Sequence, residues 1–227
     1  MHSVGVITAT LNRPSLRRAC ESVNAQSFTD WHHYVIGDGV VPVDYLCPRR
    51  TTISFTRPVG ADEPSADMPL GSPGPIYRWA ISHLELGEYV CFLDDDNEFV
   101  PTFIERMLDA LRQAPLAQIA VCALEDFRYS RPRQESESRR VSLYRIDNDP
   151  APPMDGYPED GRCDTSGFLA RSKIAKKIGY PRILPNEDYY QDTEFIANIA
   201  KFGWVHVEDK LVLYGVGANL PPSRDRI

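Results

Sequence analysis

The hydrophobic positions in the first half of the chain alternate between two periods. Runs of consecutive apolar and β-branched residues are typical of strands that are buried on both faces of a sheet. The strands predicted in this way are Val4–Thr8, Tyr34–Ile36, Thr51–Phe55, Tyr89–Leu93 and Ile119–Ala123. Between them, apolar residues recur at helical spacing, which predicts helices at residues 15–24, 76–86 and 101–111. This alternation predicts an α/β fold with a mostly parallel central sheet flanked by helices.

The pattern weakens in the second half of the chain. A charged stretch at residues 131–140 separates two short β-like pieces, 127–129 and 141–146, and a proline-rich connector follows at 150–158. The elements predicted after it are helices at 172–178 and 190–202 and strands at 204–207 and 211–214. We therefore expect a single domain over residues 1–227, with ligands beyond the carboxyl ends of its parallel strands.

Composition excludes several classes of function. The chain has 25 Lys and Arg against 32 Asp and Glu, a net charge of −7, which disfavours a nucleic-acid partner. No apolar run reaches the roughly 18 residues of a transmembrane segment, and the N-terminus does not resemble a secretory signal. The five cysteines are scattered without a CxxC pair, so reduced thiols in a cytoplasmic protein are expected.

An acidic turn follows the most apolar of the predicted strands, in the sequence Asp94-Asp95-Asp96-Asn97. Three adjacent carboxylates repel one another, which costs free energy unless a cation neutralises them. Mg²⁺ or Mn²⁺ would do so, because hard cations bind carboxylate oxygens and share their remaining positions with phosphates and water. The alternative is a solvated turn that caps the following helix. The buried strand before the turn favours the metal site.

Small polar residues follow the first predicted strand, in the segment Thr8–Pro14. They would let backbone and hydroxyl groups approach a nucleotide, and Arg13 has the charge to meet a phosphate. The segment contains no glycine, which disfavours a dinucleotide fingerprint and hence a nicotinamide or flavin cofactor. Asp38 ends the second strand, where its carboxylate can accept hydrogen bonds from a base or ribose, although an ordinary turn residue is the alternative.

Four segments in this order resemble the family 2 glycosyltransferases of GT-A fold. They are Thr8-x-Thr10-x-Asn12-Arg13-Pro14, Ser22-Val23-x-x-Gln26-Ser27-Phe28-x-x-Trp31, Gly37-Asp38-Gly39 and Phe92-Leu93-Asp94-Asp95-Asp96-Asn97. The resemblance implies a donor-binding half at residues 1–125 and an acceptor-binding half at 126–227. It places the donor against Thr8, Thr10, Asn12, Arg13, Asp38, Arg78, Asp94 and Asp95. Within that set it assigns Asp38 to the nucleobase and Asp94 and Asp95 to the ribose and diphosphate. It also gives the metal Asp96 as a ligand, together with Asp94.

The same resemblance implies a catalytic base at the start of a late helix, and two segments match it, Glu187-Asp188 and Gln191-Asp192. In the family this helix ends at a glycine about three turns after the base. Gly203 follows Asp192 by about three turns, whereas it follows Asp188 by about four. We therefore assign the base to Asp192, with Asp188 and Glu194 as alternatives. Helix-start carboxylates that interact only with the macrodipole are the structural alternative.

These residues predict a metal-dependent, inverting transfer of a sugar from a nucleoside-diphosphate sugar to an acceptor hydroxyl or amine. A UDP-sugar is the expected donor, Mn²⁺ or Mg²⁺ the expected cofactor, and a small molecule or saccharide the expected acceptor. The proline- and glycine-rich segment 57–75 is a long loop that could close over the donor. A nucleotidyltransferase of related fold and a non-catalytic nucleotide-sugar binder are the alternatives, and a homo-oligomer is compatible with each.

Overall fold

The computed structural model describes residues 2–43, 45, 47–55, 73–128, 165–182 and 191–216, with the backbone alone for 125–128, 214 and 216. Several predictions fall outside these residues: most of the loop at 57–75, the charged stretch 131–140, the β-like piece 141–146, the connector 150–158 and Asp188. None of the helices in the described segments is long and apolar enough to cross a bilayer.

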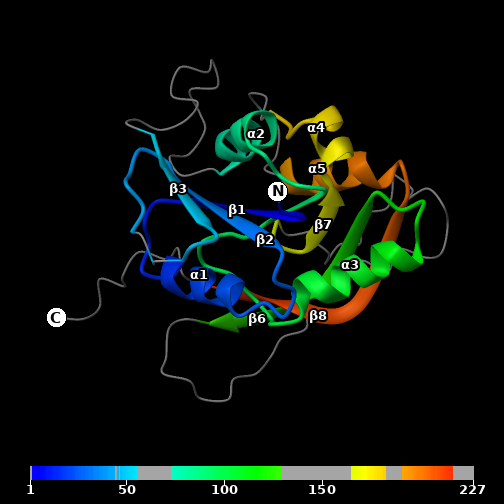
Figure 1. Cartoon of the computed structure of the whole chain (residues 1–227), viewed down its shortest axis with the longest axis horizontal. Coiled ribbons are helices and arrows are strands. Elements are labelled where there is room, and N and C mark those ends of the chain that lie inside the picture. Colours follow the sequence, from blue (N-terminus) through cyan, green and yellow to red (C-terminus); the bar gives the residue numbers. More distant parts are fainter. Residues whose placement is uncertain are drawn as a thin grey trace.

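The described part of the chain forms one eight-stranded sheet with helices on both faces (Figure 1). The strands are β1 (Val4–Thr10), β2 (Trp31–Gly37), β3 (Arg50–Ser54), β4 (Tyr89–Phe92), β5 (Glu98–Phe99), β6 (Ile119–Arg128), β7 (Phe168–Arg171) and β8 (Trp204–Val216). The helices are α1 (Leu16–Asn24), α2 (Gly74–His83), α3 (Phe103–Gln113), α4 (Ser172–Ile178) and α5 (Gln191–Ala200).

The sheet is mostly parallel, as predicted, and its strand order is β3-β2-β1-β4-β7-β6-β8-β5. The first four of these strands are parallel to one another, and β6 is parallel to β8. β7 lies between β4 and β6 and is antiparallel to both, so β4 and β6 run in the same direction. The carboxyl ends of β1, β2, β4, β6 and β8 therefore meet at one edge of the sheet, which we call the carboxyl edge.

Alternate residues of β1 enter two cores, because side chains on a strand point to opposite faces. Val4 and Val6 pack in the core that α1 and α3 cover. Ile7 and Ala9 pack in the core beneath α2, α4 and α5. Figure 1 shows these two groups of helices on opposite sides of the sheet.

Most of the predicted elements are confirmed, with three differences. The strands β5 and β7 are not predicted, because two and four residues are too short to show a period. The strands predicted at 204–207 and 211–214 form the single strand β8, whose pairing with β6 shifts register near Ala123. The helix predicted to reach residue 86 ends at His83 instead, because the backbone of Leu84 is extended. The chain then turns at Gly87, which has a positive φ and lies close to another segment. A Cβ on Gly87 would lie 2.5 Å from the His2 carbonyl oxygen, so only glycine fits there.

Candidate active site

The predicted donor-site residues converge at the carboxyl edge. Thr10 is the last residue of β1, Asp38 directly follows β2, and the acidic turn Asp94–Asp96 follows β4. The Asp38 amide donates to the Thr10 carbonyl oxygen at 3.0 Å, which joins the first two of these segments. Asp38, Asp95 and Asp96 are all buried, with at most 8% of each residue exposed.

Asp95 is held by two residues of the segment after β1. Its carboxylate accepts a hydrogen bond from the Thr10 hydroxyl at 2.6 Å and another from the Arg13 guanidinium at 3.0 Å. The same guanidinium lies 3.5 Å from the Asp96 carboxylate. Arg13 therefore supplies positive charge to two of the three aspartates. Repulsion within the triplet is therefore relieved in part by this arginine and does not by itself require a metal.

Asp94 is oriented from the opposite side of the turn. The Tyr77 hydroxyl, on α2, donates to the Asp94 carboxylate at 2.7 Å. The Ser166 hydroxyl oxygen accepts from the Asp94 amide at 3.1 Å and from the Asn97 side chain at 2.8 Å. The Asn97 side-chain oxygen accepts from the Gly215 amide at 2.9 Å, which ties the turn to β8. Of these supports, Tyr77 and Asn97 directly adjoin predicted site residues in sequence, whereas nothing local pointed to Ser166.

Asn12 shapes the loop after β1. It has a φ of 64° and is the one described non-glycine residue with a positive φ, a conformation that asparagine tolerates better than most residues. Its amide donates to the Thr10 hydroxyl at 2.8 Å, and its side-chain oxygen accepts from the Val43 amide at 3.0 Å. Asn12 thus joins the loops that follow β1 and β2.

Two predicted donor residues have hydrogen-bond partners outside the acidic turn. Thr8 is fully buried, and its hydroxyl lies 3.0 Å from the Nε2 atom of His33 in β2. The Nδ1 atom of His33 accepts from Arg50 at 3.2 Å, so the ring proton is on Nε2 and is donated to Thr8. Arg78, on α2, donates to the Pro181 carbonyl oxygen at 2.7 Å. Thr8 therefore belongs to the sheet interior, and Arg78 has a partner on the segment between α4 and α5.

The burial of His33 predicts that the protein loses stability in mild acid. Desolvation lowers the pKa of His33 well below 6.5, and the positive charge of Arg50 lowers it further. Its stabilising contribution is complete above about pH 6.5 and is lost as the pH falls toward the folded-state pKa, because the unfolded state binds the proton more tightly. The free energy of unfolding should fall by up to about 1.4 kcal/mol per pH unit for this residue.

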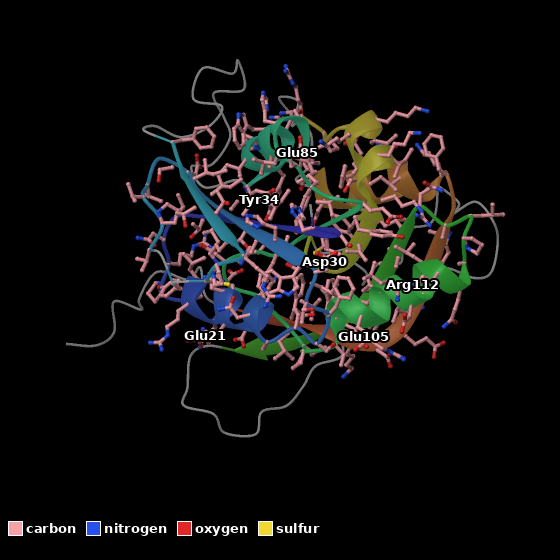
Figure 2. The ribbon with its side chains drawn as sticks, in the orientation of Figure 1. Glu21, Asp30, Tyr34, Glu85, Glu105 and Arg112 are labelled. Atoms are coloured by element: carbon pink, nitrogen blue, oxygen red, sulfur yellow. The ribbon has the colours of Figure 1, made fainter. Side chains whose placement is uncertain are left out.

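This pH dependence is measured by denaturant unfolding across pH 5 to 7, with His33→Gln as the test variant and the exposed His83→Gln as its control. His2 and His32 also have lowered pKa values, both chiefly through burial, and add to the slope. They lie beside Tyr34, whose hydroxyl donates to the Glu85 carbonyl oxygen at 2.6 Å (Figure 2). A slope that is the same in His33→Gln as in the wild type would contradict the prediction.

The topology places Asp192 at the carboxyl edge. β8 begins beside the start of β6, with Trp204 opposite Ile119. Because α5 directly precedes β8, its last turn lies near the amino ends of these strands and the helix runs there from the carboxyl edge. Its first turn, which holds Asp192, is therefore at the edge that carries the acidic turn. Asp192 is half-buried, and its carboxylate accepts from the Thr193 amide at 2.8 Å. Glu194 is exposed on the same helix.

Helix α2 contacts both α5 and the acidic turn. A Cβ on Gly74, the first residue of α2, would lie 2.2 Å from the Gln191 side-chain oxygen, so the starts of α2 and α5 are in close contact. One turn further along α2, Tyr77 binds Asp94. Beneath them, the ring of Phe195 lies 5.8 Å from that of Phe92, two residues before the acidic turn. The predicted base and the predicted metal ligands thus both lie near the start of α2.

Residues 81–179 match the sequence model of Glycosyl transferase family 2. The match covers less than half of the chain. The matched segment runs from the last turn of α2 to the end of α4, so it includes the acidic turn and excludes Thr8–Pro14 and Asp192. No curated protein matches the chain in sequence.

Solved structures with the same GT-A fold include S. aureus TarS and a mannosyltransferase. S. aureus TarS 1–349 superposes with a TM-score of 0.61 at 13% identity, over 94% of this chain and 60% of that one. Its complex with UDP-GlcNAc gives 0.61 at 15% identity, over 94% and 58%. The mannosyltransferase PcManGT from Pyrobaculum calidifontis, in complex with GDP-Man and Mn²⁺, gives 0.58 at 12% identity, over 98% and 58%. The present chain thus spans about 60% of the length of TarS 1–349.

The acidic turn supplies ligand atoms of the kind that a partial cation site needs. Among the described residues, no three His, Cys, Asp or Glu side chains are grouped so as to hold a metal by themselves. Mg²⁺ in phosphate-binding enzymes is usually held by one or two carboxylates, with substrate phosphates as further ligands. Asp94, which is half-buried, and Asp96 fit that arrangement, whereas Asp95 is bound to Thr10 and Arg13.

Proposed function

We propose that this chain transfers a sugar from a nucleoside-diphosphate sugar to an acceptor hydroxyl or amine, with inversion at the anomeric carbon. The observation that carries the proposal is that α2 contacts both the acidic turn, through Tyr77, and the start of α5, beside Asp192. A diphosphate site and a proton acceptor on one side of a sheet edge are what a displacement at an anomeric carbon requires. The family match and the donor complexes of TarS and PcManGT support the choice of substrate class.

The donor would lie across the carboxyl edge. Asp38 would accept hydrogen bonds from the nucleobase, and Asp94 and Asp95 would lie near the ribose and diphosphate. Arg13 is about 30% exposed while it contacts Asp95 and Asp96, so its remaining donors can meet a phosphate oxygen. Thr10 and Asn12 act on the donor indirectly in this arrangement, because they hold Asp95 and the loops beside Asp38.

Asp96 and Asp94 would hold Mn²⁺ or Mg²⁺ together with the diphosphate of the donor. When bound, the cation supplies positive charge to the leaving diphosphate. The chain's own part is to hold the two carboxylates in place: Arg13 restrains Asp96, and Tyr77 and Ser166 restrain Asp94. The cation would also let an acidic protein bind an anionic donor.

Asp192 would act as the general base that accepts the proton of the attacking hydroxyl or amine. The Thr193 amide binds one of its carboxylate oxygens and so orients the carboxylate at the start of α5. We place the reaction in the cytoplasm, since none of the four described cysteines is part of a disulfide. The acceptor is a small molecule or a saccharide.

Nucleotide release from sugar donors tests this function. With Mn²⁺ present, the protein should slowly hydrolyse a UDP-sugar to UDP, and UDP should raise its melting temperature. Asp96→Asn should weaken the Mn²⁺-dependent part of that shift, because it removes a proposed ligand, whereas Asp109→Asn, on the outer face of α3, should not. A requirement for a nucleoside triphosphate would indicate a nucleotidyltransferase instead, and binding without turnover would indicate a sugar-nucleotide binder.

A further inference from the structure

The lysines of this chain are confined to one region. The sequence contains five lysines and 20 arginines, and all five lysines lie between residues 173 and 210. They are Lys173, Lys176 and Lys177 on α4, Lys201 after α5 and Lys210 on β8. The chain as a whole has a net charge of −7, and all of its ammonium side chains lie within this one stretch of sequence.

Two large apolar side chains are exposed beside these lysines. Leu116, in the loop between α3 and β6, is 85% exposed, and Phe202, in the loop between α5 and β8, is 48% exposed. The two loops lie side by side, because the Gln118 amide donates to the Gly203 carbonyl oxygen at 2.7 Å. Figure 1 shows both loops at the right of the molecule, close to α4.

The lysines and the apolar side chains form a single surface. The Lys177 ammonium lies 5.3 Å from the centre of the Phe202 ring, and Lys201 is exposed directly before Phe202. Lys173 is one turn from Lys177 on the exposed face of α4. We call this surface the Leu116–Phe202 patch: Leu116, Lys173, Lys177, Lys201 and Phe202. It adjoins the starts of β6 and β8, so it lies at the edge of the sheet opposite the candidate active site.

The neighbouring charged groups are largely paired. Glu88, in the loop before β4, lies 3.3 Å from Arg171, and Lys176 donates to the Leu84 carbonyl oxygen. Arg112, in the last turn of α3, pairs with Asp109 at 2.9 Å (Figure 2). The patch therefore has an excess of positive charge around Leu116 and Phe202.

We propose that the Leu116–Phe202 patch docks on an anionic lipid surface. Lysines near an anionic membrane are attracted without any fixed geometry, and exposed apolar side chains between them can enter the headgroup region. A protein partner is disfavoured, because protein interfaces are depleted in lysine and enriched in arginine. This chain uses arginine four times as often as lysine, yet lysine surrounds the patch. Docking here would leave the carboxyl edge facing away from the lipid.

Vesicle flotation tests the proposal. The whole chain should float with vesicles of mixed phosphatidylcholine and phosphatidylglycerol, should bind phosphatidylcholine alone much more weakly, and should be released by salt. The Lys177→Glu/Lys201→Glu variant should bind the mixed vesicles at least about 20-fold more weakly, because each lysine contributes about fivefold. Leu116→Ser/Phe202→Ser should also lose binding. Arg17→Glu, which changes an exposed charge on α1, is the matched control.

Each variant must unfold at the same denaturant concentration as the wild type, and each should keep the wild-type rate of UDP release in solution. The lipid assay does not depend on the proposed activity, so the two proposals can fail separately. Absence of binding, equal binding to neutral vesicles, or an equal loss in Arg17→Glu would overturn the lipid proposal. So would a homodimer that Phe202→Ser dissociates, since a second copy would then cover the patch.

Discussion

Asp192→Asn should lower the rate of nucleotide release by about 10²–10⁴-fold, the usual contribution of a general base. The affinity for UDP should stay near that of the wild type, because the proposed donor contacts lie on other segments, at Asp38, Arg13 and the acidic turn. The substitution is well matched to the geometry. The Thr193 amide binds a carboxylate oxygen of Asp192, and the asparagine amide retains an oxygen that can accept this hydrogen bond. The substitution removes the negative charge and the ability to take up a proton, while the shape of the side chain stays the same.

The control for this experiment is Glu194→Gln on the same helix. Glu194 is exposed, and its loss changes the charge of α5 by the same amount. A large fall in turnover with Asp192→Asn and a small one with Glu194→Gln would distinguish a proton acceptor from a helix-dipole effect. If Asp192→Asn stayed active, the base would have to be sought elsewhere, with Asp188 as the remaining sequence candidate.

The sequence predicted the elements with a long, regular period. The runs that became β1, β2 and β4 are apolar enough to indicate strands buried on both faces, and α1 and α3 have a clear apolar side. Because parallel strands end at the same edge, the sequence also predicted that Thr10, Asp38 and Asp94–Asp96 would come together. The short strands β5 and β7 escaped prediction, because the partner strands that stabilise them are distant in sequence.

The pairing of charges within the site could not be predicted from the sequence. Thr10 and Asp95 are 85 positions apart, and no local sequence pattern predicts the hydrogen bond between them. Arg13 was predicted to meet a phosphate, but whether it also neutralises Asp95 depends on how the loop after β1 folds. That loop is set by the positive φ of Asn12.

Thr8 and Thr10 show a second limit of sequence reasoning. Both belong to the segment that resembles the family motif, and both lie on the same face of β1, two residues apart. Thr10 is at the strand end and binds Asp95, whereas Thr8 is one step deeper and binds His33. The difference depends on the position of β2, which brings His33 beneath the edge. A motif therefore identifies a strand end more securely than it identifies the residues that face the ligand.

The aromatic cluster beneath the site links packing to the candidate chemistry. Phe92 is fully buried at the end of β4, and its ring lies within 6 Å of four other rings. Tyr77, at 4.2 Å, carries the hydroxyl that binds Asp94, and Phe195, at 5.8 Å, follows Asp192 by one turn of α5. Phe92 thus contacts the helix that orients the acidic turn and the helix that carries the predicted base.

We therefore expect Phe92→Ala to lower the free energy of unfolding by about 3–5 kcal/mol, the usual cost of truncating a fully buried phenylalanine to alanine. It should also lower nucleotide release per folded molecule, because Tyr77 and α5 lose a common support. Phe103→Ala is the matched control: Phe103 is fully buried on the opposite face, where it stacks on Phe99. Its cost in unfolding should be similar, but activity per folded molecule should be retained. If both variants lost activity equally at the same folded fraction, Phe92 would act on the site only through global stability.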